Sequence, residues 1–212
     1  MRPDREDVVT LDFETVMDAR AGYSLQKMSS RAFVTDPRFA IIAVGIAIGT
    51  SDVLVFTRGG PAGGDLDDAR VLLEREAAAG RWVAVQNVAF EAVVLKLGWG
   101  IQFANVFDVA GYLRFLNLGY SLENIGHGIG MPKSAAPAFD LRVLSDPAGL
   151  AQLVQYNAND VMVTRHVLHL AGLVSRWFVE PDLRRIFGWR LERIAERFGG
   201  DASTGQLRIE SR

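Results

Sequence analysis

The sequence predicts an α/β protein whose core is a mixed five-stranded sheet with flanking helices. Three short apolar segments follow one another within the first 57 residues of the 212-residue chain without an intervening helical pattern. Two more alternate with helical segments, and the rest of the chain is helical in pattern. Three consecutive strands followed by strand–helix alternation give a sheet that is antiparallel on one side and parallel on the other.

The predicted strands are bounded by turn residues and rich in β-branched side chains. Residues 39–48 are almost entirely apolar, which is typical of a strand buried on both faces. Residues 49–52 form a turn, so the next strand returns antiparallel. The expected strands are 8–15, 39–48, 53–57, 82–86 and 103–109.

The predicted helices are recognised by their end signals. Acidic residues open the first helix and Gly80 closes it, Gly98 closes the second, and Ser121 caps the third. A long helix starts at Asp146-Pro147, and Pro181 lies in the first turn of a last one. The expected helices are 65–79, 89–97, 122–130, 146 to about 174, and about 181–198. We expect one domain over residues 1–200 and a disordered tail over 201–212.

Composition excludes several classes of function. The chain has no cysteine, so disulfides, thiol catalysis and cysteine–zinc sites are excluded. Its three histidines lack zinc-protease spacing, and its net charge of −2 gives no overall basic field for nucleic acid. The charged N-terminus is unlike a signal peptide, and the longest apolar run is too short for a membrane span. We expect a soluble, cytoplasmic protein.

Three groups of residues suggest chemistry. Asp12 and Glu14 lie two apart on the first strand, so both carboxylates point to one face, where a divalent cation would relieve their repulsion. Glu91 lies in the first turn of a helix after Asn87, either as a favourable helix-end acid or as a group aimed at the edge of the sheet. Taken singly, each pattern is also consistent with a purely structural role.

The third group is Tyr156 and Asp160, which lie four apart and therefore share one helix face. Tyr156 alone reads as an aromatic residue at the edge of the core, and Asp160 as a surface acid. The residues that follow, such as Val161 and Val163, are strongly apolar. We therefore expect Asp160 near the buried side of the helix, with a partner.

Together and in this order, the three groups resemble the DEDD superfamily of 3′→5′ exonucleases, in the subgroup that carries tyrosine, on a ribonuclease-H-like fold. Residues 12–15, 23–28 and 36–39, and then 121–125 and 130–133, further resemble proofreading domains of phage-type family A DNA polymerases. The resemblance runs from about residue 8 to 173. It implies that the protein is found in the cytoplasm of a bacterial or phage-infected cell.

The resemblance implies two Mg²⁺ or Mn²⁺ ions bound by Asp12, Glu14, Glu91 and Asp160. Asp12 would bridge both ions, Glu14 and Asp160 would hold the ion that activates water, and Tyr156 would orient that water. Glu91 would support the second ion, directly or through water. Oxygen ligands suit these ions.

Further positions match the family near the terminal nucleotide. Thr15 and Asn87 would hydrogen-bond the 3′ end, while Phe90 either contacts a base or fills the core. Asp108 is expected to have a supporting or structural role.

Two features depart from the family pattern. Glu91 replaces the usual aspartate and adds a rotatable bond, which makes the second ion's affinity and identity uncertain. No polymerase domain follows in this sequence, and the helix about 181–198 is amphipathic, with arginines between its apolar residues. That helix either packs on its own domain, contacts a separate polymerase subunit or guides single-stranded DNA.

The leading hypothesis is therefore a 3′→5′ exonuclease acting on single-stranded or frayed DNA. A DEDD-type exoribonuclease is the nearest alternative, because no residue visibly tests for a 2′-hydroxyl. A degenerate exonuclease fold that binds a polymerase is a third hypothesis, which the four retained acids and the tyrosine disfavour. The oligomeric state is left open.

Overall fold

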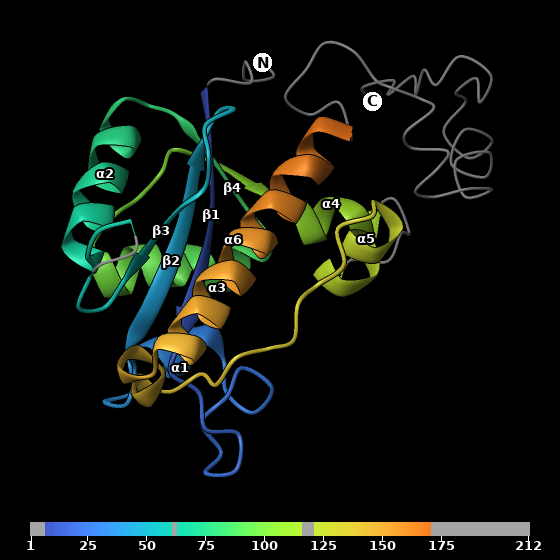
Figure 1. Cartoon of the computed structure of the whole chain (residues 1–212). Helices are drawn as coiled ribbons and strands as arrows, with labels where there is room; N and C mark the ends of the chain where they lie inside the picture. Colours follow the sequence, from blue (N-terminus) through green and yellow to red (C-terminus); the bar gives the residue numbers. More distant parts are fainter. Residues whose placement is uncertain (1–6, 61–62, 116–120, 171–212) are drawn as a thin grey trace.

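A single five-stranded sheet forms the centre of the molecule (Figure 1). The computed structural model describes residues 7–60, 63–115 and 121–170. The strands lie in the order β3-β2-β1-β4-β5. They are β1 (Val8–Thr15), β2 (Ile41–Ile48), β3 (Leu54–Thr57), β4 (Trp82–Val85) and β5 (Asn105–Asp108).

Strand directions match the predicted mixed sheet. β1 pairs antiparallel with β2, and β2 pairs antiparallel with β3. On its other side β1 pairs parallel with β4, which pairs parallel with β5. β1 therefore lies in the middle of the sheet, and all eight of its residues are buried. The predicted fold class is confirmed.

Helices cover both faces of the sheet. One face carries α1 (Ser30–Val34), α2 (Leu66–Ala78) and α3 (Val88–Val93), the last continuing into the π-helix η2 (Val94–Trp99). The other face carries α4 (Val109–Phe115), α5 (Leu122–Gly128) and α6 (Pro147–Leu170), with the 3₁₀ turn η3 (Leu141–Ser145) before α6. Figure 1 shows α6 crossing this second face in front of β1 and β2, which it contacts.

End signals in the sequence account for several helix boundaries. Asp65 forms a capping box with Asp68 at the start of α2, and Gly80 follows the helix with a φ of +74°. The Ser121 hydroxyl accepts a hydrogen bond from the Asn124 N–H at the start of α5. These two helices were predicted, and their observed ends lie within two residues of the predicted ones.

Other boundaries were predicted wrongly. Gly98 does not end the second helix, because the chain continues as η2 through Trp99, and Gly100 closes it with a left-handed φ of +76°. β2 begins at Ile41 rather than at residue 39. β5 runs from Asn105 to Asp108 rather than over 103–109, and α4 begins directly after it. α1, α4 and η3, each of seven residues or fewer, were not predicted.

Some predictions concern residues outside the described ranges. These are the end of the long helix after residue 170, the helix about 181–198 and the tail 201–212. Among the described residues, no helix is long and apolar enough to cross a membrane.

Candidate metal centre

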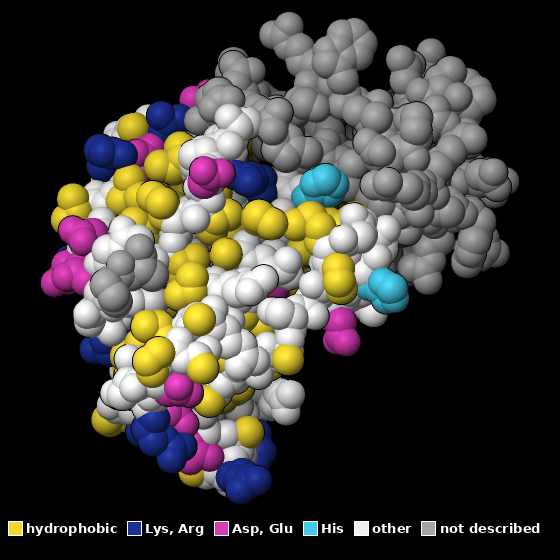
Figure 2. Space-filling model, in the orientation of Figure 1, with side chains coloured by type: hydrophobic (Ala, Val, Ile, Leu, Met, Phe, Trp, Pro, Cys, Tyr) yellow, Lys and Arg dark blue, Asp and Glu magenta, His cyan; other side chains and the backbone are white. Residues whose placement is uncertain are grey.

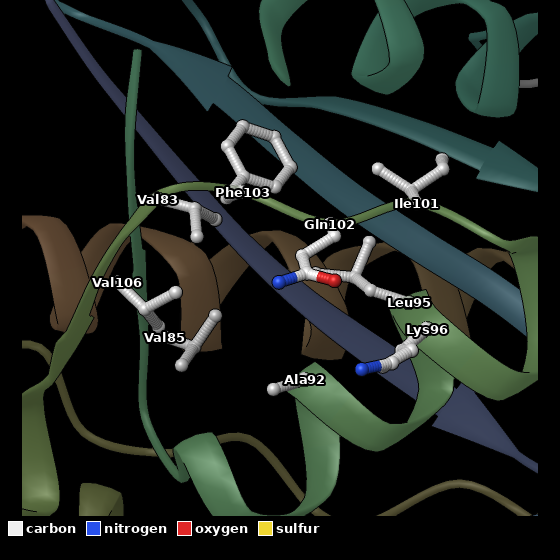
Figure 3. Close-up of a pocket in the computed structure, with 9 residues that line it drawn as sticks. All are labelled: Val83, Val85, Ala92, Leu95, Lys96, Ile101, Gln102, Phe103 and Val106. Atoms are coloured by element: carbon white, nitrogen blue, oxygen red, sulfur yellow. The ribbon is translucent and has the colours of Figure 1, made fainter. Parts of the chain in front are cut away.

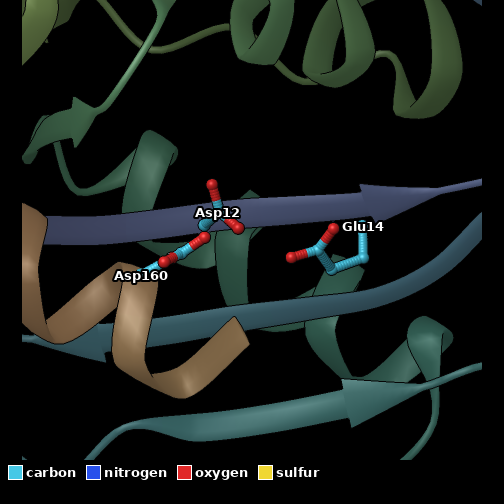
Figure 4. Close-up of side chains that lie close together, drawn as sticks. All are labelled: Asp12, Glu14 and Asp160. Carbon is cyan, nitrogen blue, oxygen red and sulfur yellow. The ribbon is translucent and has the colours of Figure 1, made fainter. Parts of the chain in front are cut away.

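Three buried carboxylates meet between the sheet and α6 (Figure 4). Asp12 and Glu14 come from β1, and Asp160 comes from α6. One carboxylate oxygen from each lies within 4.8 Å of the other two. Asp160 lies 146 positions after Glu14 and 148 after Asp12 in the sequence, and the fold brings all three into a group of the size that metal ligands need.

The alternation of β1 places the acids on one face and apolar side chains on the other. Leu11 and Phe13 join the core beneath α1, α2 and α3, whereas Asp12 and Glu14 point toward α6. The pairing with β2 shifts by one residue between Glu14 and Thr15. This irregularity ends the regular ladder at the acidic pair.

Gly45 allows α6 to approach the sheet closely. It pairs with Asp12 in the β1–β2 ladder. A Cβ atom at this position would lie 2.6 Å from Asn157 Oδ1 and 2.8 Å from Val161 Cγ2. Those distances are shorter than van der Waals contact, so a larger residue would push α6 away and separate Asp160 from β1.

Asn157 fixes the position of Asp12. Its side-chain amide donates to Asp12 Oδ2 at 2.9 Å and to the Asp12 backbone oxygen at 3.1 Å. Asn157 is fully buried, so this amide is desolvated and its bonds to Asp12 orient the carboxylate strongly.

The carboxylates repel one another in a poorly solvated space. Burial, and secondly the charge of Asp160, raises the pKa of Asp12 to about 7. Burial and then the charges of Asp12 and Asp160 raise the pKa of Glu14 well above its usual value. Burial also raises the pKa of Asp160. A bound cation would stabilise all three in the charged form.

Lys133 supplies one positive charge to this group. Its Nζ lies 2.7 Å from Asp160 Oδ2 and 4.5 Å from the centroid of the Tyr156 ring. Burial alone would lower the pKa of Lys133, but its hydrogen bonds to Asp160 and Tyr156 outweigh burial and raise it. One ammonium beside three carboxylates leaves the group negative when all are charged.

Tyr156 lies at the edge of the carboxylate group. Its ring packs edge-on against Phe139, with centroids 5.9 Å apart, and carries Lys133 on its face. Burial raises its pKa, so the phenol stays protonated at neutral pH and can donate a hydrogen bond. The expectation that Asp160, one turn further on, is buried and has a partner is confirmed.

Glu91 lies close to the group but outside it. It is buried in the first turn of α3, and its Oε2 has no hydrogen-bond partner. Burial, followed by the charge of Asp12, raises its pKa well above the usual value. Asp108, at the end of β5, lies close to Gly111 in α4, and its charge also raises the pKa of Glu91, which is consistent with the supporting or structural role expected for it. Glu91 therefore interacts with Asp12 electrostatically but does not complete a four-acid cluster.

The three residues expected near a nucleotide differ in their surroundings. Thr15 is buried at the end of β1. Asn87 occupies the N-cap position of α3, but its side chain makes no capping hydrogen bond. Phe90 is buried in the core and packs edge-on against Phe33 with centroids 5.9 Å apart, which favours the core-filling role over contact with a base.

The donor atoms fit a divalent metal ion. All the candidate ligands are carboxylate oxygens, which Mg²⁺ and Mn²⁺ prefer. Asp160 Oδ1 and Glu91 Oε2 are buried without a hydrogen-bond partner, which is costly for a carboxylate unless a cation contacts it. The group thus suits divalent metal binding.

The surface has one hollow next to the carboxylate group and another on the opposite face of the sheet. One, of about 550 Å³, adjoins it and includes Lys133 and Tyr156 in its wall together with the start of α5. The other, of about 190 Å³, lies on the α3 side of β4 and β5 and is mainly apolar (Figure 3). Its walls are formed by Val83, Val85, Ala92, Leu95, Lys96, Ile101, Gln102, Phe103 and Val106.

Sequence reasoning missed Asn157 and Gly45 and gave Lys133 no role. Asn157 lies three residues before Asp160 and so shares its helix face, which could have identified it. Gly45 was a glycine inside an apolar strand, a signal of close backbone approach. Lys133 lies in a segment without periodicity, so only the fold brings it to Asp160.

Comparisons with known proteins were made at the level of sequence and of structure. No family model matches the chain, and no curated protein matches it. The catalytic core of RRP6 from Trypanosoma brucei matches in structure with a TM-score of 0.51 and 16% identity. The match covers 85% of this chain and 47% of that one, so the chain spans about half the length of this relative.

A second solved structure, described as the apo form of a nuclease, matches over 96% of this chain and 90% of its own length. Its TM-score is 0.52 and its identity 17%. At such identities the likeness shows the fold alone, a ribonuclease-H-like α/β sheet with flanking helices that this chain shares with these two structures. The finer resemblance to phage polymerase proofreading domains gains no support from these structures.

Proposed function

We propose that this chain is a metal-dependent 3′→5′ exonuclease that hydrolyses phosphodiester bonds at the 3′ end of single-stranded or frayed DNA. The observation that supports this most is the group of Asp12, Glu14 and Asp160, buried together on an exonuclease fold. When bound there, two divalent ions supply an activated water and stabilise charge at the phosphate and the leaving oxygen.

Each residue of the group has a distinct role in this proposal. Asp12, Glu14 and Asp160 hold the ions, and Asn157 orients Asp12 through two hydrogen bonds. Tyr156 stays protonated and donates its hydroxyl hydrogen to orient the attacking water. Glu91 supports an ion indirectly, since it is close enough to sense Asp12 but stands outside the group.

The distribution of charge on the surface is consistent with a substrate whose phosphates are bound through the metal ions. On the face that carries α6, Lys and Arg side chains lie in small groups mixed with acids (Figure 2). The described part of this face shows no continuous basic area for a phosphate backbone. The hollow beside Tyr156 has a volume of about 550 Å³, within the usual range for ligand sites, and we assign it to the terminal nucleotide.

RNA is the alternative substrate. Among the described residues at the site, none is placed so that it visibly distinguishes a ribose, which has a 2′-hydroxyl, from a deoxyribose. A role in proofreading, beside a separate polymerase subunit, rests on the sequence resemblance of residues 8–173 alone.

Degradation of 5′-labelled oligonucleotides tests the proposal. Matched single-stranded DNA and RNA are incubated with the protein and Mg²⁺, Mn²⁺ or EDTA, with Asp12→Ala in parallel. We expect a ladder of products shortened from the 3′ end that requires metal and Asp12, and faster loss of DNA than of RNA.

Two results would change the proposal in different ways. If both substrates stay intact under every metal condition, the chain is not a nuclease and the interaction-module hypothesis takes its place. If RNA is degraded faster than DNA, the reaction class stands but the substrate is wrong. Circular dichroism of Asp12→Ala checks that the fold is retained.

A further inference from the structure

Lys133 places a positive charge in direct contact with the carboxylate group. Its Nζ lies 2.7 Å from Asp160 Oδ2, a distance typical of a charge-assisted hydrogen bond. The same ammonium lies over the Tyr156 ring, 4.5 Å from its centroid. Lys133 thus contacts both Asp160, a candidate metal ligand, and Tyr156.

The segment that carries Lys133 is anchored on both sides. We call residues 131–139, which connect α5 toward η3 without regular secondary structure, the strap. Met131 N–H donates to Gly126 O at 2.7 Å, and Phe139 O accepts from Met17 N–H at 2.9 Å. Between these points, the Gln152 side chain donates to Ala135 O at 3.0 Å.

Close packing at α5 adds to this anchoring. A Cβ atom at Gly126 would collide with the backbone oxygen of Met131, so glycine permits the contact between α5 and the strap. The strap therefore presents Lys133 to Asp160 through its own backbone contacts rather than through the carboxylate alone.

A lysine in this position has two opposing effects on a divalent ion. Its ammonium repels another cation and offsets part of the negative charge of Asp160. Against this, it holds Asp160 in place, which would help an ion to bind. Lys133 Nζ lies 2.7 Å from Asp160 Oδ2, while Asp160 Oδ1 is buried without a hydrogen-bond partner. An ion at Oδ1 would share one carboxylate with the ammonium, and their repulsion at such close range favours competition.

We propose that Lys133 sets the affinity of the carboxylate group for divalent ions by competing with them for Asp160. This inference rests on the proposed metal-dependent function but concerns binding rather than turnover. It assigns Lys133 the role of a competing cation whose removal strengthens metal binding, the opposite of what loss of a merely orienting residue would do.

Manganese titration of the full chain tests the inference without substrate. The protein is stripped with EDTA and dialysed, and free Mn²⁺ is measured from its electron paramagnetic resonance signal. Lys133→Met removes the charge at similar length, Lys133→Arg keeps it, and Lys133→Gln is a second neutral variant. Lys96→Met, at the apolar hollow beyond the sheet, is the matched control.

We expect Lys133→Met and Lys133→Gln to bind Mn²⁺ about tenfold more tightly or better, since a charge removed at contact distance outweighs a lost orienting bond. Lys133→Arg and Lys96→Met are expected to stay near wild type. The midpoint of thermal unfolding should rise further on adding Mn²⁺ in the neutral variants than in wild type.

The outcomes separate this inference from the proposed function. If wild type and every variant bind no Mn²⁺, the metal-dependent function itself fails. If wild type binds and the neutral variants bind equally or more weakly, Lys133 only orients Asp160 and the inference is overturned. It is also overturned if both neutral variants fail to fold while wild type and Lys133→Arg fold, because Lys133 would then be structural.

Discussion

One face of the sheet carries a mainly apolar hollow and the other a group of buried carboxylates. The hollow beneath α3 is bounded mainly by apolar side chains, with Lys96 and Gln102 among them (Figure 3). The region beneath α6 holds Asp12, Glu14 and Asp160, whose pKa values are all raised by burial (Figure 4). Both regions adjoin strands of one sheet. Of the two, the region beneath α6 is the one in which several ionisable side chains converge and have shifted pKa values, as is typical of functional sites.

The presence of an apolar hollow is therefore not enough to locate the functional site of this protein. A binding site is usually expected where an apolar hollow also contains several polar groups that point into it. In this molecule those two properties lie on opposite faces: the apolar hollow lies on the α3 side of β4 and β5, whereas β1 directs Asp12 and Glu14 toward α6. The following changes test that separation, beginning with the largest effect.

Removing the charge of Asp160 should abolish most activity, whereas the same change at Glu91 should cost less. Asp160 belongs to the close group of three and Glu91 does not. We expect Asp160→Asn to slow single-turnover hydrolysis by about 10³-fold and Glu91→Gln by about 10- to 100-fold. Equal losses would place Glu91 among the direct ligands.

Stability of the metal-free protein should fall as the pH rises from about 4 to about 7. The pKa of Asp12 is 3.8 in its ordinary state and about 7 when folded. The folded protein therefore binds more protons than the unfolded one in this range, so stability present below pH 4 is lost as the pH approaches 7.

The contribution of Asp12 is at most about 4 kcal/mol, from a shift of roughly three pKa units. Urea unfolding in EDTA at a series of pH values measures it, with Asp12→Asn as the control. We expect the variant to lose less stability over this range than wild type. Parallel profiles for the two proteins would show that Asp12 titrates normally.

A methyl group at Gly45 should weaken the contact that brings α6 to the acids. Its Cβ would lie 2.6 Å from Asn157 Oδ1, so helix and sheet must separate. We expect Gly45→Ala to lower the free energy of unfolding by about 1–3 kcal/mol and to reduce both Mn²⁺ affinity and hydrolysis.

Gly98→Ala is the matched control, because a Cβ there would make an ordinary contact 3.6 Å from Phe39. It should leave Mn²⁺ binding unchanged. A stable Gly45→Ala protein with normal metal affinity would show that α6 can move without disturbing Asp160.

Changes in the apolar hollow should affect stability without affecting hydrolysis. Val83 is fully buried and lines that hollow from β4. We expect Val83→Ala to lower the free energy of unfolding by about 1–3 kcal/mol while the rate per folded molecule stays at the wild-type value. A specific loss of rate would connect the two faces of the sheet.

Much of the fold could be predicted because it follows from local patterns. The apolar run of β2, the turn after it and the caps at Asp65 and Ser121 each have a signature within a few residues. The end of η2 could not be predicted, since Gly98 and Gly100 are both glycines near the helix end and only Gly100 takes the left-handed conformation that closes it.

The sequence by itself determined that Asp12 and Glu14 share a face of β1 and that Tyr156 and Asp160 share a face of α6. Those relations follow from the periods of strand and helix, which act over a few residues. Only the tertiary structure decided that the two pairs meet, that Glu91 stands apart and that Lys133 contacts Asp160. These contacts depend on the close approach of α6 at Gly45 and on the anchored strap, which join residues far apart in the chain.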